Sequence, residues 1–238
     1  MSIRHTTIII LLSASIRISA QQPTIPIIIA PQSGTPVTLY GTVTAADSRP
    51  ARFRYSYRVN TSATNVSDKG ILLMITQVQV NREVSDDKLA TTERSLTKID
   101  DEFFNSSLFG PTATKTSDDF LAPLDGLPAD SEAEPAAATA VAKVLFVQFA
   151  DGSLWGDGKA AEGALRERGL ALERLRLLQE TYWTMGEQQF LAELLKPSQL
   201  VAVRSLQGIY LENKDAGAVI ERLTLMLHNG ELHLRGLR

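Results

Sequence analysis

The spacing of apolar residues changes near Gly158 in this 238-residue chain, and this change constrains the fold more than any other feature. Before Gly158, apolar and polar side chains tend to alternate with a period of two, as in half-buried β-strands. After Gly158, apolar residues recur at the 3.6-residue spacing of amphipathic helices. The sequence therefore predicts an α+β protein, with an antiparallel β-domain over residues 21–157 and a helical segment over residues 158–238.

The β-domain is predicted to be a sandwich of about seven strands. Its clearest strand is RFRYSYRVN, residues 52–60, and the following TSATNVSDKG, residues 61–70, is expected to be a polar turn-forming link. Residues 81–101 fit a helix and a strand equally. The alternative fold is one α+β unit in which the helices cover an open sheet. The other strands are expected over residues 25–29, 37–43, 71–80 and 141–150, on each side of a turn at Gly110-Pro111, and over residues 153–155.

Two stretches, residues 1–20 and 121–140, are not expected to belong to the folded core. Residues 1–20 combine a basic start, a short apolar run and small residues before Gln21, which predicts a secretory signal peptide. Residues 121–140 are rich in proline, alanine and acidic residues. We expect them to form a flexible loop inserted before the last hairpin.

Composition excludes several classes of function. The chain has no cysteine, which excludes disulfides and thiolate chemistry. Its net charge of −3 and the lack of a basic run argue against a nucleic-acid partner. No stretch is long and apolar enough for a mature membrane span, so an integral membrane protein is not expected. An exported chain without cysteine suits a bacterial periplasm or envelope, or another extracellular setting.

The hairpin FVQFADGSLWGDG, residues 146–158, holds the first candidates for ligand contact. Asp151 and Gly152 predict a type I′ turn, in which both central residues have positive φ. Trp155, beside this turn, could stack on a sugar or a peptide. The alternative is that Trp155 fills the end of the sandwich or contacts the helical segment. Tyr182 and Trp183 are the other candidates, with a joint between two helices as their alternative role.

The helical segment is predicted to hold three or four short amphipathic helices, the last of them ending at Asn229-Gly230. His228 and His233 flank this expected end, so a helix would not align them as metal ligands. The sequence also contains no G-x-S-x-G motif, no glycine-rich phosphate loop and no calcium-loop pattern. We therefore expect no cofactor and no catalytic residue.

The strand RFRYSYRVNTS and the VQFADGSLWG hairpin, with the N-terminal signal and helical tail, resemble a loose set of uncharacterised exported bacterial proteins. The resemblance implies an immunoglobulin- or fibronectin-III-like sandwich without an assigned activity. The signal for export, the sandwich pattern and the absence of catalytic motifs predict a non-catalytic envelope or periplasmic module that binds or scaffolds another protein. A carbohydrate- or peptide-binding module using Trp155 is the first alternative, and a hydrolase with an unrecognised site is the second.

Overall fold

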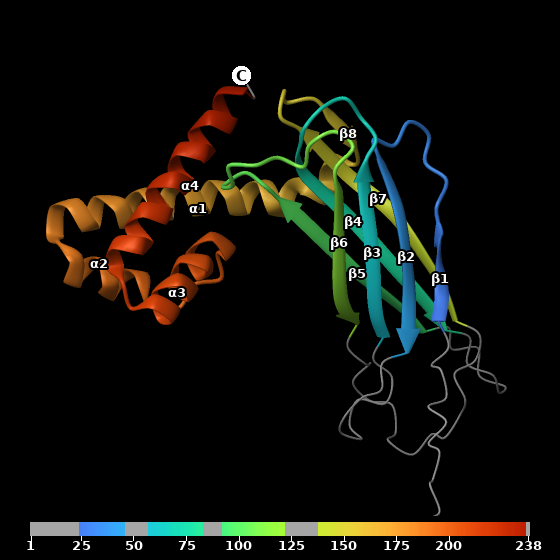
Figure 1. The fold of residues 1–238 in the computed structure, drawn as a ribbon, viewed down its shortest axis with the longest axis horizontal. Coiled ribbons are helices and arrows are strands. Elements are labelled where there is room, and N and C mark those ends of the chain that lie inside the picture. Colours follow the sequence, from blue (N-terminus) through green and yellow to red (C-terminus); the bar gives the residue numbers. More distant parts are fainter. Residues whose placement is uncertain (1–23, 46–56, 83–91, 122–137, 237–238) are drawn as a thin grey trace, which may run out of the picture.

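A computed structural model describes residues 24–45, 57–82, 92–121 and 138–236. It shows eight strands followed by four helices (Figure 1). The strands are β1 (Thr24–Ile29), β2 (Val37–Ala45), β3 (Tyr57–Asn65), β4 (Ile71–Arg82), β5 (Thr92–Asp101), β6 (Thr114–Leu121), β7 (Ala138–Phe149) and β8 (Leu154–Gly156). The helices are α1 (Gly158–Met185), α2 (Glu187–Leu194), α3 (Val201–Asn213) and α4 (Ala216–Gly236). The expected α+β class, with strands first and helices last, is confirmed.

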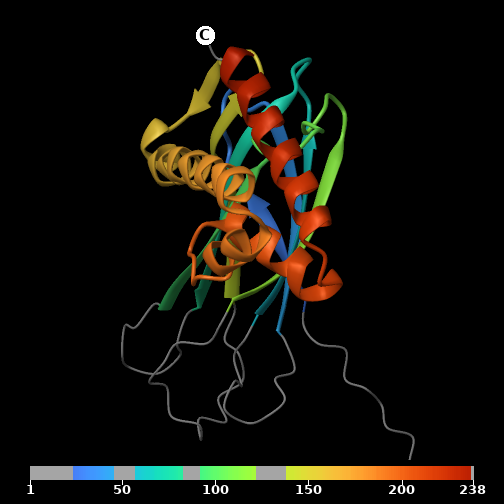
Figure 2. The ribbon, with the colours of Figure 1, turned by 90° about the vertical axis from the view of Figure 1, so that its left-hand side faces the viewer.

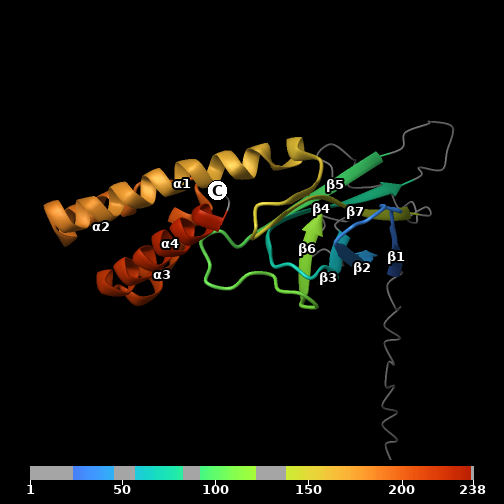
Figure 3. The same cartoon turned by 90° about the horizontal axis from the view of Figure 1, so that it is seen from above.

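The strands form one large, mostly antiparallel sheet that curves almost into a barrel. Its order is β5-β4-β7-β1-β2-β3-β6, and β8 pairs with β7. Strand β1 joins the two halves, because residues 24–26 pair with β2 and residues 27–29 pair in parallel with β7. The two halves face each other around this joint (Figure 3). The immunoglobulin-like sandwich is therefore not confirmed, since β1 makes the sheet continuous.

Apolar side chains from both halves of the sheet meet in one core. Val43 and Val59 come from β2 and β3, while Met74 and Val144 come from β4 and β7, and all four are buried. Tyr57 and Val59 point inward and Arg58 outward, as the alternation in RFRYSYRVN predicts for the part that is described. Residues 52–56 of that predicted strand lie outside the described residues.

The first turns of α1 pack against the outer face of the sheet, and the helical segment then extends beyond it (Figures 1 and 2). Asp157 caps α1 by accepting a hydrogen bond from the Lys159 amide at 3.0 Å. Ala161 and Ala164 in the first turns of α1 pack on Phe146 of β7. The helices also share a core with the sheet, because Phe103, just after β5, is buried among helical side chains.

Several sequence predictions about element boundaries are wrong. Residues 61–65 belong to β3, where hydroxyl pairs such as Thr61 with Ser117 link the strands at 2.6 Å. Residues 92–101, left undecided by the sequence, form β5. The bounds predicted for the flexible loop, residues 121–140, are wrong at both ends, since Leu121 lies in β6 and residues 138–140 lie in β7. Residues 122–137 and the predicted signal peptide, residues 1–20, lie outside the described residues.

Helix α4 continues through Asn229-Gly230 to Gly236, so the predicted helix end is also wrong. Gly230 is buried against α1 and the loop after β5. A Cβ atom there would lie 3.1 Å from Leu172 Cδ2 and 3.2 Å from Phe103 Cε1. The glycine therefore serves close packing inside a helix and does not stop it.

Candidate functional site

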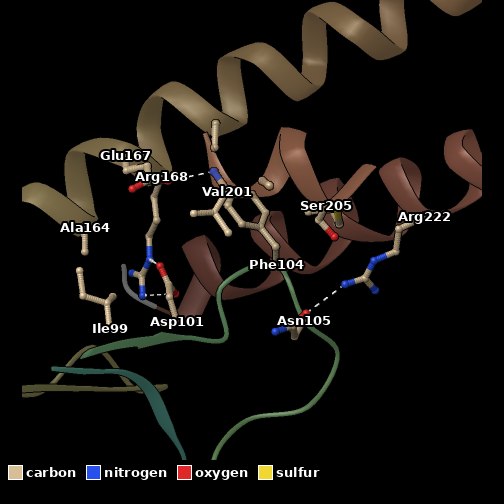
Figure 4. A pocket seen from close by; sticks show the side chains of 13 residues that line it. Ile99, Asp101, Phe104, Asn105, Ala164, Glu167, Arg168, Val201, Ser205 and Arg222 are labelled. Carbon is tan, nitrogen blue, oxygen red and sulfur yellow. Dashed lines mark hydrogen bonds and ion pairs between the residues drawn. The ribbon is translucent and has the colours of Figure 1, made fainter. Parts of the chain in front are cut away.

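A cleft of about 350 Å³ lies where the end of the curved sheet meets the helices (Figure 4). Strand β5 and the loop that follows it form one wall, and helices α1, α3 and α4 form the others. The walls are mostly apolar, with a few charged and polar side chains among them. The lining residues are Ile99, Asp101, Phe104, Asn105, Ala164, Glu167, Arg168, Ala171, Val201, Ala202, Ser205, Arg222 and Met226.

Small side chains on two helices leave the space that becomes the cleft. On the buried face of α1, Ala164 and Ala171 are small, and Arg168 lies between them at helical spacing. Ala202 adds another small side chain from the first turn of α3. Two larger apolar side chains stand at the opening and stay accessible, since Val201 is 59% exposed and Ile99 is 51% exposed.

One of the two arginines in the cleft is fully engaged by other side chains. Arg168 is buried, and its Nε and Nη2 atoms donate to the two carboxylate oxygens of Asp101, both at 2.7 Å. Its Nη1 atom donates to Gln148 Oε1 at 2.7 Å, and its guanidinium lies 4.7 Å from the centre of the Phe103 ring. Arg168 therefore ties α1 to the end of β5 and to β7.

The second arginine has a different environment. Arg222 Nη2 donates to Asn105 Oδ1 at 3.0 Å, and within the described residues it has no acidic partner. Asn105 in turn donates to Glu102 Oε2 at 2.7 Å, and the other oxygen of Glu102 pairs with Lys115. The charge of Glu102 is therefore neutralised by Lys115 and does not neutralise Arg222. Arg222 keeps an unneutralised charge at the side of the cleft.

The other polar groups of the cleft are a carboxylate and a hydroxyl. Glu167 accepts a hydrogen bond from the backbone N–H of Val201 at 3.1 Å, at the start of α3. Ser205, one turn further along α3, is exposed. Across the part of the chain that the structure describes, its hydroxyl makes no hydrogen bond to protein atoms. The hydroxyl is thus a donor or acceptor for a bound group.

The hairpin candidates, Asp151 and Trp155, lie away from this cleft. Trp155 is partly buried and packs against the core between the two halves of the sheet. Asp151 pairs with Lys69 at 2.7 Å and accepts from Ser153. These contacts, the one with Lys69 above all, hold the pKa of the Asp151 carboxyl well below its usual range.

The geometry of the hairpin turn differs from the type I′ prediction. The Gly152 N–H donates to the Phe149 carbonyl at 3.0 Å, and Gly152 has φ of 84°. Asp151 is not among the described residues with positive φ. The loop has the hydrogen bonds of a three-residue connection with a glycine bulge, in which only the glycine needs positive φ.

The candidates on the helices lie at the far end of α1 from the hairpin. Tyr182 packs edge-on against Phe190 at 5.4 Å between ring centres, as the joint between α1 and α2. Trp183 is 71% exposed and lies beside Ile220 and Leu225 of α4. Helix α1 from residue 158 to residue 182, about 36 Å at 1.5 Å per residue, separates this end from the hairpin. The four residues do not form one site.

The two C-terminal histidines share helix α4 but not a site. His233 Nδ1 lies 2.9 Å from the Phe103 carbonyl oxygen, while His228 is exposed next to Trp183. In the described ranges, no group of three histidine, aspartate or glutamate side chains could hold a metal ion. None of the described helices is long and apolar enough to cross a membrane.

None of the polar residues that line the cleft was predicted from the sequence to belong to a site. Asp101 and Arg168 are 67 positions apart, and Asn105 and Arg222 are 117 positions apart. Pairs this distant leave no local pattern in a single sequence. The one available signal was on α1, where Arg168 occupies the apolar stripe between Ala164 and Ala171.

Comparison with known proteins adds little to this picture. No protein-family model and no curated protein matches the sequence. One matching solved structure is that of a hypothetical protein from Peptoclostridium difficile 630. It is 14% identical, the match covers 57% of this chain and 92% of that one, and the TM-score is 0.31. A similarity this low carries no argument about function.

Proposed function

We propose that this chain is an exported, non-catalytic module that binds an extended segment of another protein. The cleft between β5 and the helices holds an anchoring side chain of that segment. The observation that carries the proposal is the position of the cleft. It opens beside an edge strand of the sheet, so one bound segment can use both the edge and the cleft.

Strand β5 supplies the edge. It pairs with β4 on one side and ends the hydrogen-bonded order of the described strands on the other. An edge strand of this length offers unpaired backbone groups to an added strand. Ile99 connects the edge strand to the cleft, because it lies in β5 and lines the cleft. An added strand would therefore lead one of its side chains toward the cleft.

The cleft has the size and lining of a side-chain pocket. Its volume of about 350 Å³ falls in the range of small-ligand sites. Ala164, Ala202 and Met226 give it an apolar floor that is rigid because these residues are buried in the helical packing. An apolar anchor from the segment would gain about 25 cal/mol per Å² of surface removed from water.

Three features support the non-catalytic and exported parts of the proposal. The carboxylates of the cleft are occupied, Asp101 by Arg168 and Glu167 by the Val201 amide. Ser205 has no base within hydrogen-bonding distance among the described residues, and a serine nucleophile needs one. The charge, apolar run and small residues of positions 1–20 support export.

The two alternatives have less support. A sugar-binding role for Trp155 would need an open indole face, whereas this indole is half-buried against the core. A hydrolase would need a nucleophile with an adjacent base. We therefore favour protein binding through the cleft.

A library of random linear peptides, displayed on phage and selected against the full chain, tests the proposal. We expect selected peptides to bind the wild-type chain and to lose about tenfold or more in affinity for Val201→Trp, whose indole fills the cleft. Leu211→Trp is the matched control, because Leu211 is 58% exposed on the same helix and lies outside the cleft. Failure to select any peptide, or equal affinity for both variants, would refute the proposal.

A further inference from the structure

We infer that the Arg222 side of the cleft binds a carboxylate of the captured segment. This inference rests on the proposed function and adds the chemical group that the cleft recognises. The group comes either from the C-terminus of the segment or from an aspartate or glutamate side chain. Both sources offer the same two oxygens to Arg222.

The contrast between the two arginines carries the inference. Arg168 donates three hydrogen bonds, two to Asp101 and one to Gln148. Arg222 donates one, to the neutral amide oxygen of Asn105. A guanidinium has five N–H donors in a fork that fits a carboxylate. Arg222 thus keeps both its charge and most of its donors for a bound group.

The loop after β5 holds Arg222 in place without neutralising it. Asn105 is oriented by its donation to Glu102 Oε2, which leaves its carbonyl oxygen toward Arg222 (Figure 4). Glu102 is held by Lys115 on its other oxygen. The guanidinium is therefore positioned before a ligand arrives, and less rotational freedom is lost on binding.

Nearby groups favour a carboxylate over a neutral ligand. Ser205 lines the same cleft and offers a hydroxyl without a protein partner among the described residues. Phe104 and Met226 line the cleft as well, and their apolar surface lowers the local dielectric constant. Of the two acidic residues of the lining, Asp101 is neutralised by Arg168, and Glu167 accepts from the Val201 N–H at the start of α3. Among the described residues, neither carboxylate pairs with Arg222, which stays available to the ligand.

Three small probes test the inference by NMR titration of the ¹⁵N-labelled full chain. N-acetyl-Leu-Phe carries a C-terminal carboxylate, N-acetyl-Glu-Phe-amide carries a side-chain carboxylate, and N-acetyl-Leu-Phe-amide carries neither. We expect at least one carboxylate probe to shift the amides of Ser205 and Asn105 and to bind about tenfold tighter than the neutral probe. The tighter of the two acids identifies the source of the group.

Variants of the arginine separate charge recognition from packing. Arg222→Ala should remove the preference for the acids, and Arg222→Lys should keep part of it. Ser205→Ala should weaken the preferred acid by about threefold. Arg204→Ala is the control, since Arg204 is exposed on α3 and lies outside the cleft.

Equal binding of the three probes, no binding of any, or an unchanged preference in Arg222→Ala would overturn the inference. Loss of the preference in Arg204→Ala as well would also overturn it. The peptide selection with Val201→Trp is independent of these outcomes. Peptides that need an open cleft but no carboxylate would leave the proposed function standing without its charged contact.

Discussion

Arg168 of α1 and Asp101 at the end of β5 form a two-pronged ion pair, with both N–O distances at 2.7 Å. The arginine is only 5% exposed, so its charge depends on this partner and on Gln148. The pair connects the first helix to the edge strand at the floor of the cleft. Together with the bond from Arg168 to Gln148, it holds α1 against the sheet.

Removing one member of this pair should destabilise the whole chain. Asp101→Asn leaves the buried guanidinium without a counter-charge, and we expect it to lower the free energy of unfolding by about 3 kcal/mol. Arg58 and Asp118 form the matched control, since they pair on the exposed outer face of the sheet. Asp118→Asn should cost far less than Asp101→Asn, because solvent screens an exposed ion pair. Urea unfolding measures both, and equal losses would contradict the assigned role of Arg168.

Two glycines in long helices should respond in opposite ways to alanine. Gly163 on the exposed face of α1 has open space around it, so Gly163→Ala should raise the free energy of unfolding by about 0.5–1 kcal/mol. Gly230→Ala should not raise the free energy of unfolding, because a Cβ atom there would lie within 3.2 Å of Leu172 and Phe103 and would crowd them. Thermal unfolding of the two variants tests the close packing of α4, and equal stabilisation would contradict it.

The sequence predicted the elements whose own residues form an apolar pattern. The alternation before Gly158 and the 3.6-residue period after it correctly separated strands from helices. Residues 61–65 were missed because cross-strand hydroxyl pairs, such as Thr61 with Ser117, hold this part of β3. Strand β5 was undecided because as an edge strand it carries mostly polar residues.

The candidate site was beyond the reach of sequence patterns. Its walls come from β5, the next loop and three helices, which come together only in the folded chain. Asn229-Gly230 was taken for a helix end because this dipeptide usually marks one. In the folded chain Gly230 is buried against Phe103 and α1, and the helix continues past it. This contact exists only in the tertiary structure.

The two tryptophans should differ in accessibility. In Trp155→Phe the remaining Trp183 is 71% exposed, whereas in Trp183→Phe the remaining Trp155 is partly buried. Acrylamide should therefore quench fluorescence more strongly in Trp155→Phe. Trp155→Ala should also cost about 1–3 kcal/mol in stability, while Trp183→Ala should change it by less than about 0.5 kcal/mol. Stronger quenching of Trp155 would contradict its contact with the core.

The Asp151 carboxylate should stabilise the hairpin in a pH-dependent way. Lys69, followed by Ser153, lowers the pKa of Asp151 in the folded chain below the value of about 3.9 that it has when unfolded. The contribution is complete above the unfolded value and is lost as the pH falls toward the folded one. The melting temperatures of wild type and Asp151→Asn should differ at neutral pH and converge below about pH 4. A constant difference would show that the ion pair has no role.

Hydrogen–deuterium exchange with a selected peptide tests the central claim most directly. If the peptide adds to β5 and anchors in the cleft, exchange should slow at Thr92–Asp101 and at residues 201–205, while the opposite edge strand β6 stays unchanged. Protection confined to β6, or to the Trp155 hairpin, would place the binding surface elsewhere and contradict this account.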